Sequence, residues 1–515
     1  MTRALGGPVR RGAPRTSPWA VARRRWQPNH GCVAAHAGRP SRRSSPGESP
    51  SWSEGVQLGP FVGGSCHPSG LACIVRSVEL FAGAGGLGLG CELAGFHAVK
   101  VVEWDRWACD TVRENRAAAH PLVASWDVVE GDVRGVDWSD IVEPVDLVTG
   151  GPPCQPFSAG GKGRAADDRR DMFPAAIEVI RTLTPRAFIL ENVRGLTRAA
   201  FANYYQYILL QLAYPELASR PDEAWGEHYE RLQVEHTSAH DTALRYNVVP
   251  TLVNAADYGV PQQRHRVFMV GFRSDIEAEW SFPAQTHSFD SLLYSQWVIG
   301  DYWERHKVPT KERPSMPERV ATRVNKLRSI DPSMLHRPWR TVRDALVGLP
   351  DPRSAAARKH LNHVFQGGAK SYHGHSGSPI DMPAKALKSG VHGVPGGENM
   401  LLNPDGTIRY FTVRESARLQ TFPERYELHG AWGEAMRQLG NAVPVLLAQK
   451  VAGSVAEHLT LAALREAAMD RRASSTQAAY PTTDQLQMAP LTETGDNVTD
   501  PRVISGDIVG GVPGI

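Results

Sequence analysis

The chain has 515 residues, of which 22% are charged and 41% hydrophobic, and its formal net charge is +3. This near-average composition excludes a wholly disordered or collagen-like chain, and a length of this order allows about two to four domains. No run of about 18 apolar residues occurs, so no membrane span is expected. Six cysteines in so long a chain predict a reducing, intracellular setting rather than a disulfide framework.

Residues 1–74 differ from all that follows. They hold ten Arg, no Lys and two acidic residues among many Pro, Gly and Ser, and they show neither a helical nor a strand period. We expect a disordered extension, an Arg-rich targeting peptide, or a stretch upstream of the true translation start. This segment carries +8, so residues 75–515 carry −5, and any affinity for a polyanion must come from a local basic surface.

From Ser77 onward, short apolar runs alternate with amphipathic stretches. Such alternation predicts an α/β fold built on a doubly wound, mostly parallel sheet. The expected buried parallel strands are Ser77–Phe81, His97–Val102, Asp146–Val148, Ala187–Leu190 and Val267–Gly271. The expected helices among them are Gly86–Ala94, Trp107–Ala118 and Phe173–Leu183.

The alternation stops between about Ser274 and Asn403, where Gly, Lys, Arg and His are frequent and loops are expected. A helical pattern returns at Val413–Leu419 and again from Val443 to about Arg465. These patterns predict five segments: an extension (1–74), a catalytic cofactor-binding domain (75–273), a smaller loop-rich domain (274–435), a C-terminal helix that returns to the catalytic domain (436–468) and a flexible tail (469–515).

A glycine-rich loop follows the first expected strand. Residues 83–88 match G-x-G-x-x-G, in which glycine permits a tight turn and a close approach of the backbone to a ligand. Glu103 follows Gly83 by twenty residues, where a carboxylate can accept hydrogen bonds from ribose hydroxyls. Trp104 could stack on an adenine ring, and Asp132 could accept from its amino group. The pattern suits a nicotinamide dinucleotide or S-adenosylmethionine, and a tight turn without a ligand also remains open.

A cysteine follows the fourth expected strand at the edge of the sheet where open α/β folds bind ligands. Cys154 comes after two prolines, which fix φ and restrict the position of the thiol. A lone cysteine is more often a small buried residue, but this setting favours a reactive one. The glycine-rich stretch that follows, with Lys162 and Arg164, is flexible enough to close over a substrate.

Polar side chains also end the later strands. Glu191 ends the fifth strand at the same edge, although the pair Glu191-Asn192 would more often cap a helix. Strand alternation places Gln262, Arg264 and Arg266 on one face, either within a site or as a solvated basic edge.

In combination, these motifs resemble those of the cytosine-C5 DNA methyltransferases of the bacterial restriction-modification type, and they occur in the same order. The motifs that carry the resemblance are Phe81–Gly86, Pro152–Gln155, Glu191–Val193, Gln262–Arg266, Arg414–Pro423 and Gly440–Pro444. They lie between about residues 77 and 460, and no departure falls on a motif that carries chemistry.

The resemblance implies transfer of a methyl group from S-adenosylmethionine to C5 of a cytosine flipped out of double-stranded DNA, without a metal. Cys154 would add to C6 of the base, and Glu191 would hold its N3 and amino group. Arg264 would contact the base carbonyl or support Cys154, and Arg266 would brace the site. The implied setting is a monomer in the bacterial cytoplasm, at the nucleoid, with a restriction endonuclease as functional rather than physical partner.

The resemblance also implies a methyl-donor site and a DNA-reading region. The expected methyl-donor contacts are Phe81, Gly83, Gly85, Gly86, Leu87, Glu103, Trp104, Asp132, Pro152, Met172, Asn441 and Ala442. Residues 275–405 correspond to the target-recognition domain of the family, where side chains would read base edges or hold phosphates. The candidates there are Lys370, His373, His375, Lys385, Lys388 and His392.

Three other functions are consistent with parts of the pattern. A dinucleotide-dependent oxidoreductase would explain the glycine-rich loop but would leave residues 152–155 and 262–266 without roles. A tRNA methylase related to this family would have a shorter recognition region, and the two-cysteine RNA methylases need a second catalytic thiol. Cys91 and Cys109 fall in expected helices and are poor candidates for it. A non-catalytic DNA-binding relative is disfavoured because Cys154, Glu191 and Arg264 are all present.

Overall fold

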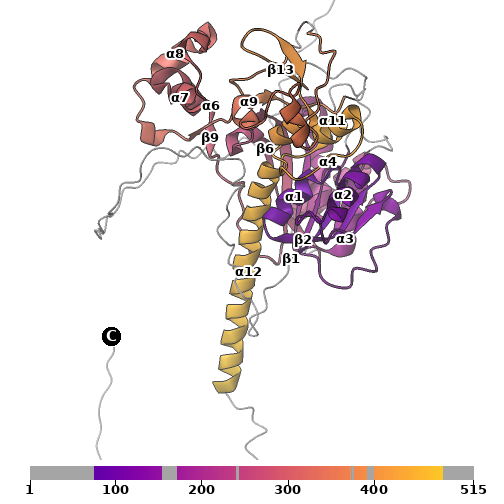
Figure 1. Cartoon of the computed structure of the whole chain (residues 1–515). Coiled ribbons are helices and arrows are strands. Elements are labelled where there is room, and N and C mark those ends of the chain that lie inside the picture. Colours follow the sequence, from indigo (N-terminus) through magenta and orange to yellow (C-terminus); the bar gives the residue numbers. More distant parts are fainter. Residues whose placement is uncertain are drawn as a thin grey trace, which may run out of the picture. The chain divides into compact units, whose positions relative to one another are not determined.

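The computed structural model describes residues 75–153, 171–238, 243–371, 373, 376–390 and 399–479 (Figure 1). Several residues expected to act in catalysis or DNA binding lie outside this part of the chain, namely Cys154, Lys162, Arg164, His375 and His392.

A seven-stranded sheet forms the core of the first two hundred described residues, in the order β3-β2-β1-β4-β5-β8-β6. Its strands are β1 (Val75–Leu80), β2 (Phe96–Glu103), β3 (Val128–Glu130), β4 (Leu147–Gly150), β5 (Ala187–Val193), β6 (Tyr246–Asn254) and β8 (His265–Arg273). Neighbours from β3 to β5 pair in parallel, whereas β8 is antiparallel to both β5 and β6. The prediction of a mostly parallel, doubly wound sheet is confirmed.

The expectation that Val267–Gly271 is a parallel strand is wrong. This segment lies in β8, which begins only ten residues after the end of β6. A parallel neighbour would need a crossover of about a dozen residues or more, so the short connection requires the antiparallel pairing that is observed.

Helices cover both faces of the sheet. They are α1 (Gly86–Leu93), α2 (Arg106–Ala117), α3 (Phe173–Leu183), α4 (Ala202–Ala213), α5 (Trp225–Ser238) and α12 (Val445–Ala479). On one face, α3 and α4 bury Ile177, Ile180 and Ile208 against strand residues such as Val148 and Leu190. On the other face, α1 and α12 pack together over Leu147, Ile189 and Val270.

The strand order reverses at β1, because the chain proceeds outward from β1 to β3 and then returns to β4 on the other side. Open α/β sheets bind their ligands in the crevice at such a switch point, outside the carboxyl ends of the strands. The glycine-rich loop after β1 and Pro152 after β4 therefore flank one crevice.

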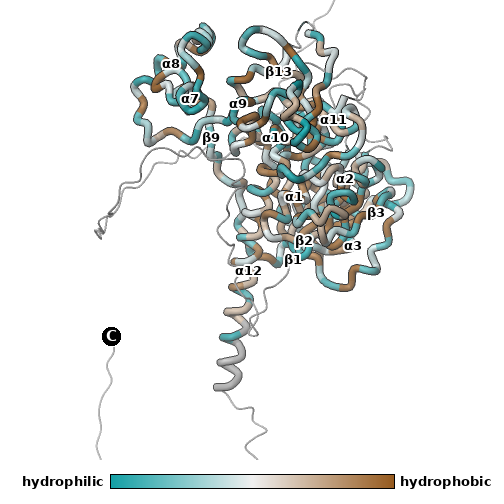
Figure 2. The backbone as a smooth tube through the Cα atoms, in the orientation of Figure 1, coloured by the Kyte–Doolittle hydropathy of each residue, from teal (hydrophilic) through white to brown (hydrophobic). Residues whose placement is uncertain are grey.

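Residues 274–412, which we call the small domain, contain several short elements. Its helices are α6 (Phe289–Tyr294), α7 (Asp301–Arg305), α8 (Glu318–Leu327) and α9 (Val342–Leu346), with a π-helical turn at Ser295–Ile299. Its strands are β9 (His287–Ser288), β10 (Arg337–Pro338), β11 (Ser378–Pro379), β12 (Ala384–Lys385), β13 (Met400–Leu402) and β14 (Ile408–Tyr410), and β12 pairs with β7 (Gln262–Gln263) of the preceding chain. The loop-rich expectation therefore missed these four helices, of which α7 and α8 are mainly polar (Figure 2).

The segment after the small domain packs with the cofactor half, so the boundary expected at residue 435 does not coincide with a change in packing. Its helices α10 (Val413–Leu419) and α11 (Trp432–Asn441) bury Ala417 and Met436 in one apolar cluster with Ala84 and Leu89. Furthermore, α12 runs to Ala479, so the first residues of the expected tail are helical.

Candidate active site

The glycine-rich loop rests on a buried tryptophan. Gly83 and Gly85 have positive φ angles of 55° and 86°, which L side chains rarely adopt. A Cβ atom at Gly85 or Gly88 would lie 3.0 or 2.8 Å from the ring of Trp126, which is fully buried. Phe81, which precedes the loop, also has a positive φ of 55°, a conformation that is strained for a bulky residue and often marks a functional site.

A turn at the end of α11 forms a second wall against this loop. A Cβ atom at Gly86 would lie 2.4 Å from the carbonyl oxygen of Val443 and 3.2 Å from Cβ of Ala442. Asn441 is exposed beside it. The turn and the start of α1 are therefore in contact, as the expected methyl-donor site requires.

The side chain of Leu87, in the first turn of α1, is buried in the apolar cluster that includes Leu447 and Val451 of α12. No side chain caps this end of the helix, and a helix N-terminus favours an anionic or carboxylate group.

The Glu103 carboxylate connects the glycine-rich loop to the end of β2 through hydrogen bonds. It accepts hydrogen bonds from the backbone N–H groups of Gly83, Trp104 and Asp105, at 2.7, 2.9 and 2.8 Å. Burial raises the pKa of Glu103 in spite of these three donors. The side chain of Trp104 beside it is 78% exposed and is free to stack on a flat ligand.

Asp132 lies after β3 and forms an ion pair with Arg134, with 2.5 Å between Oδ2 and Nη2. This partner lowers the pKa of Asp132 to about 2, so the side chain is a carboxylate. A contact with an adenine amino group would have to be shared with Arg134.

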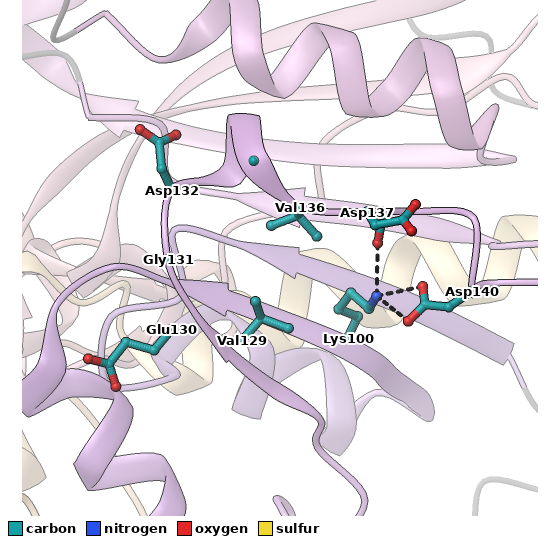
Figure 3. Close-up of a pocket in the computed structure, with 9 residues that line it drawn as sticks. Lys100, Val129, Glu130, Gly131, Asp132, Val136, Asp137 and Asp140 are labelled. Carbon is teal, nitrogen blue, oxygen red and sulfur yellow. Dashed lines mark hydrogen bonds and ion pairs between the residues drawn. The ribbon is translucent and has the colours of Figure 1, made fainter.

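A cavity of about 430 Å³ is lined by Asp132 and Lys100, among other residues. Figure 3 shows these residues, and Lys100 donates to both carboxylate oxygens of Asp140, at 2.6 and 2.7 Å. Asp132 belongs to both this cavity and the expected methyl-donor site, but the glycine-rich loop does not line the cavity. The cavity is therefore a separate feature of the surface.

The structure brings Glu191 and Arg266 together at the edge of the sheet. Antiparallel pairing places Arg266 opposite Val193, on the same face as Glu191, and Nε of Arg266 lies 2.6 Å from Oε1 of Glu191. Both side chains are buried. Burial raises the pKa of Glu191, although Arg266 and Arg264 oppose the shift. A Cβ atom at Gly151 would lie 3.4 Å from Oε2 of Glu191, so this carboxyl group lies beside the chain that leads to Cys154.

Asn192 holds the chain before Cys154 and was missed by the sequence analysis. Its Nδ2 donates to the carbonyl oxygen of Pro152 at 2.9 Å. Met172, beyond the segment that contains Cys154, donates its backbone N–H to Pro153 at 3.4 Å. Pro152 and Met172 thus flank the two ends of that segment, close to Glu191.

Arg264 is fully buried and donates to two backbone carbonyl groups. Its Nη1 donates to the carbonyl oxygen of Leu387 at 3.1 Å, and its Nη2 donates to that of Gly440 at 2.7 Å. Because Gln262 and Arg264 are fully buried, a solvated basic edge is excluded. Arg266 rather than Arg264 is the arginine that contacts Glu191.

The motif at 414–423 is structural. Arg414 is 1% exposed and donates to the carbonyl oxygens of Leu361, Pro423 and Tyr426. The hydroxyl of Tyr426 in turn donates to the carbonyl oxygen of Ala84 in the glycine-rich loop, at 3.0 Å. Arg414 therefore supports the methyl-donor site indirectly.

Candidate DNA-reading residues in the small domain differ in exposure. Lys370, His373 and Lys388 are exposed, whereas Lys385 is half-buried in β12. Within the described ranges, no helix is long and apolar enough to span a bilayer, and no group of His, Cys, Asp and Glu side chains is arranged to hold a metal.

The fold and these contacts define a Rossmann-like α/β protein whose glycine-rich loop lies at the switch point of its sheet. The family model for C-5 cytosine-specific DNA methylases matches residues 75–214 and 227–457. The chain therefore belongs to this family and is a DNA cytosine-C5 methyltransferase, which excludes the oxidoreductase alternative.

Individual relatives agree with this assignment. The chain is 31% identical to the type II methyltransferase M.PspPI of Psychrobacter sp. (strain TA137), over 75% of this chain and 80% of that protein. It is 28% and 30% identical to the type II methyltransferases M.NgoPII and M.NgoMIV of Neisseria gonorrhoeae, over 75% and 74% of this chain and 96% and 97% of those proteins.

Proposed function

We propose that the chain methylates C5 of a flipped cytosine within a specific sequence of double-stranded DNA, through a covalent bond between Cys154 and C6. The observation that carries the proposal is the buried Glu191–Arg266 pair beside Gly151, at the sheet edge that also carries the glycine-rich loop. This arrangement supports an acid–base role for Glu191, because its carboxyl group lies next to the chain that leads to Cys154.

The residues around the glycine-rich loop fit S-adenosylmethionine as the methyl donor. The uncapped start of α1 suits the carboxylate of its methionine part, Glu103 suits the ribose hydroxyls, and the exposed Trp104 suits the adenine ring. Asn441 and Ala442 would close the opposite wall. When bound, S-adenosylmethionine supplies an electrophilic methyl group.

The side chains of this protein would make C5 of the cytosine nucleophilic enough to accept that methyl group. C5 of cytosine is a poor nucleophile, so a thiolate at Cys154 first forms a bond to C6. Burial raises the pKa of Glu191, which favours its action as a proton donor to N3 in this step. Transfer of the methyl group to C5 would break its bond to the sulfonium sulfur and leave S-adenosylhomocysteine. Loss of the C5 proton to solvent, return of the N3 proton to Glu191 and cleavage of the bond between the Cys154 sulfur and C6 would then restore the aromatic ring.

Arg266 would keep Glu191 oriented toward the base. Nε of Arg266 lies 2.6 Å from Oε1 of Glu191, and both side chains are largely shielded from water. The pairing leaves the second carboxyl oxygen of Glu191, Oε2, beside Gly151, where a flipped base could be held.

Affinity for DNA would come from the small domain. Residues 301–343 contain eleven basic and five acidic residues, a net charge of +6, although residues 75–515 as a whole carry −5. A local basic surface of this kind attracts the phosphate backbone. Residues 370–392 would supply contacts to base edges.

The type II relatives favour a role in host protection beside a restriction endonuclease. We also propose that the protein acts as a monomer in a bacterial cytoplasm. Bisulfite sequencing of DNA treated with the purified protein and S-adenosylmethionine tests the proposal. We expect protected cytosines in one short sequence context, and random or absent protection would contradict a sequence-specific cytosine methylase.

A further inference from the structure

Two hydrogen-bonded connections, one through Arg264 and one through Gln262, join the small domain to residues Gly440–Ala442 beside the expected methyl-donor site. Leu387 of the small domain is held at both of its backbone groups: its carbonyl oxygen accepts from Arg264, and its N–H donates to Oε1 of Gln262 at 3.0 Å. Gln262 lies in β7, and Arg264 is the residue between β7 and β8.

The other ends of the two links lie at the C-terminal end of α11. Arg264 donates to the carbonyl oxygen of Gly440 at 2.7 Å. Nε2 of Gln262 donates to Oε1 of Gln420 at 3.2 Å, and Nε2 of Gln420 donates to the carbonyl oxygen of Ala442 at 3.3 Å. The links therefore hold both Gly440 and Ala442.

The two parts of the chain are also in direct contact. A Cβ atom at Gly440 would lie 2.3 Å from the backbone nitrogen of Ser389 and 2.4 Å from the carbonyl carbon of Lys388. On its other side, the same turn contacts Gly86 at the start of α1. Displacement of residues 387–389 would therefore be transmitted to the methyl-donor wall.

The burial of these polar groups indicates a specific role. Gln262, Arg264 and Gln420 are each 0% exposed, and Nε of Arg264 has no hydrogen-bond partner among the described residues. Burial of a guanidinium group without a carboxylate hydrogen bond is costly, and apolar residues would fill the same space at less cost. A buried polar network that is retained in spite of its cost often fixes one arrangement of the parts that it joins.

We infer that Arg264, together with Gln262, is a positioning residue for S-adenosylmethionine. The pair holds residues Gly440–Ala442, which flank the methyl-donor site, in place against the small domain. This inference rests on the proposed function only in the identity of the methyl donor. It differs from a base-contacting role for Arg264, which would act on DNA and on the chemical step.

The test compares Arg264→Met, Gln262→Met and Gly440→Ala in the full chain. Calorimetric titration with S-adenosylmethionine in the absence of DNA should show affinities about five- to tenfold weaker than wild type, as loss of one buried hydrogen bond implies. In steady-state assays, the KM for the methyl donor should rise by a similar factor while the KM for DNA stays within about twofold. Gly440→Ala provides a second route to the same loss if the arginine variant does not fold.

Two matched controls test the assignment. Gly453→Ala adds a methyl group where no atom lies within 4 Å, and Arg418→Met removes a buried arginine that contacts Ala345, Val347 and Glu424 instead. Neither should change the affinity for S-adenosylmethionine. Unchanged affinity in all three test variants, or a rise confined to the KM for DNA, would overturn the inference. Wild-type protein that binds the methyl donor but methylates no DNA would instead contradict the proposed function.

Discussion

Glu79 gives the most specific prediction about the support of the glycine-rich loop. This side chain of β1 is 2% exposed, accepts a hydrogen bond from the hydroxyl of Thr149 and another from the backbone N–H of Gly88 in α1. Burial raises the pKa of Glu79 from 4.5 to about 8. The folded protein therefore holds a neutral carboxyl group at pH 7, whereas the unfolded chain exposes a carboxylate.

The sign of the pH dependence follows from this difference. The unfolded state loses its proton near pH 4.5 and the folded state near pH 8, so the free energy of unfolding falls between these values and is constant above them. A shift of about 3.5 pH units corresponds to about 5 kcal/mol. In Glu79→Gln the amide stays neutral at every pH and can still accept from Gly88. The free energy of unfolding of this variant should therefore not fall between pH 4.5 and pH 8 for this reason.

Urea unfolding of wild type and Glu79→Gln at pH 5, 7 and 9 measures the effect. The variant should match wild type at pH 5 and exceed it by several kcal/mol at pH 9. Glu178→Gln is the matched control, since the Glu178 side chain is 59% exposed and should give the wild-type profile. Parallel pH profiles for wild type and Glu79→Gln would refute the reasoning.

Three further changes test other contacts. Asn192→Ala removes the hydrogen bond to Pro152 and should lower kcat about 10- to 100-fold by misplacing Cys154, with both KM values retained. A wild-type rate of methyl transfer in single-turnover assays would exclude this role. Gly88→Ala places Cβ 2.8 Å from Trp126 and should destabilise the fold by about 1–3 kcal/mol in urea unfolding. Gly131→Ala is the control, because no neighbouring atom lies within 4 Å of its Cβ. Equal stability of the two variants would argue against tight packing between Gly88 and Trp126. The double change of Arg319 and Lys326 on α8 to Ala should reduce the slope of log affinity against log salt by about 1.8, and an unchanged slope would show that α8 does not contact phosphates.

Periodic patterns predicted the parts of the fold that depend on local sequence. The bounds of α3 and α10 agree with the expected residues because each helix has a clear amphipathic period with a definite end. In contrast, β6 was missed because Pro250 interrupts the pattern of a strand that lies at the sheet edge, where proline is tolerated. The short helices α6–α9 were missed because packing in the small domain, rather than sequence period, stabilises them.

The candidate site was predictable in composition but not in its contacts. Alternation predicted that Gln262, Arg264 and Arg266 share one face. It could not show that Gln262 and Arg264 bond to the small domain while Arg266 contacts Glu191. The packing of Trp126 under the glycine-rich loop was also unpredictable. It depends on contacts between residues far apart in the sequence, and no local pattern records them.

Identification of the methylated nucleoside tests the proposed reaction most directly. Duplex DNA incubated with the protein and methyl-labelled S-adenosylmethionine would be digested and separated into nucleosides. We predict label in 5-methyldeoxycytidine alone, with none in reactions of Cys154→Ser, and a covalent adduct with DNA that carries 5-fluorocytosine at the target. Label in another nucleoside, or full activity of Cys154→Ser, would contradict the proposed mechanism.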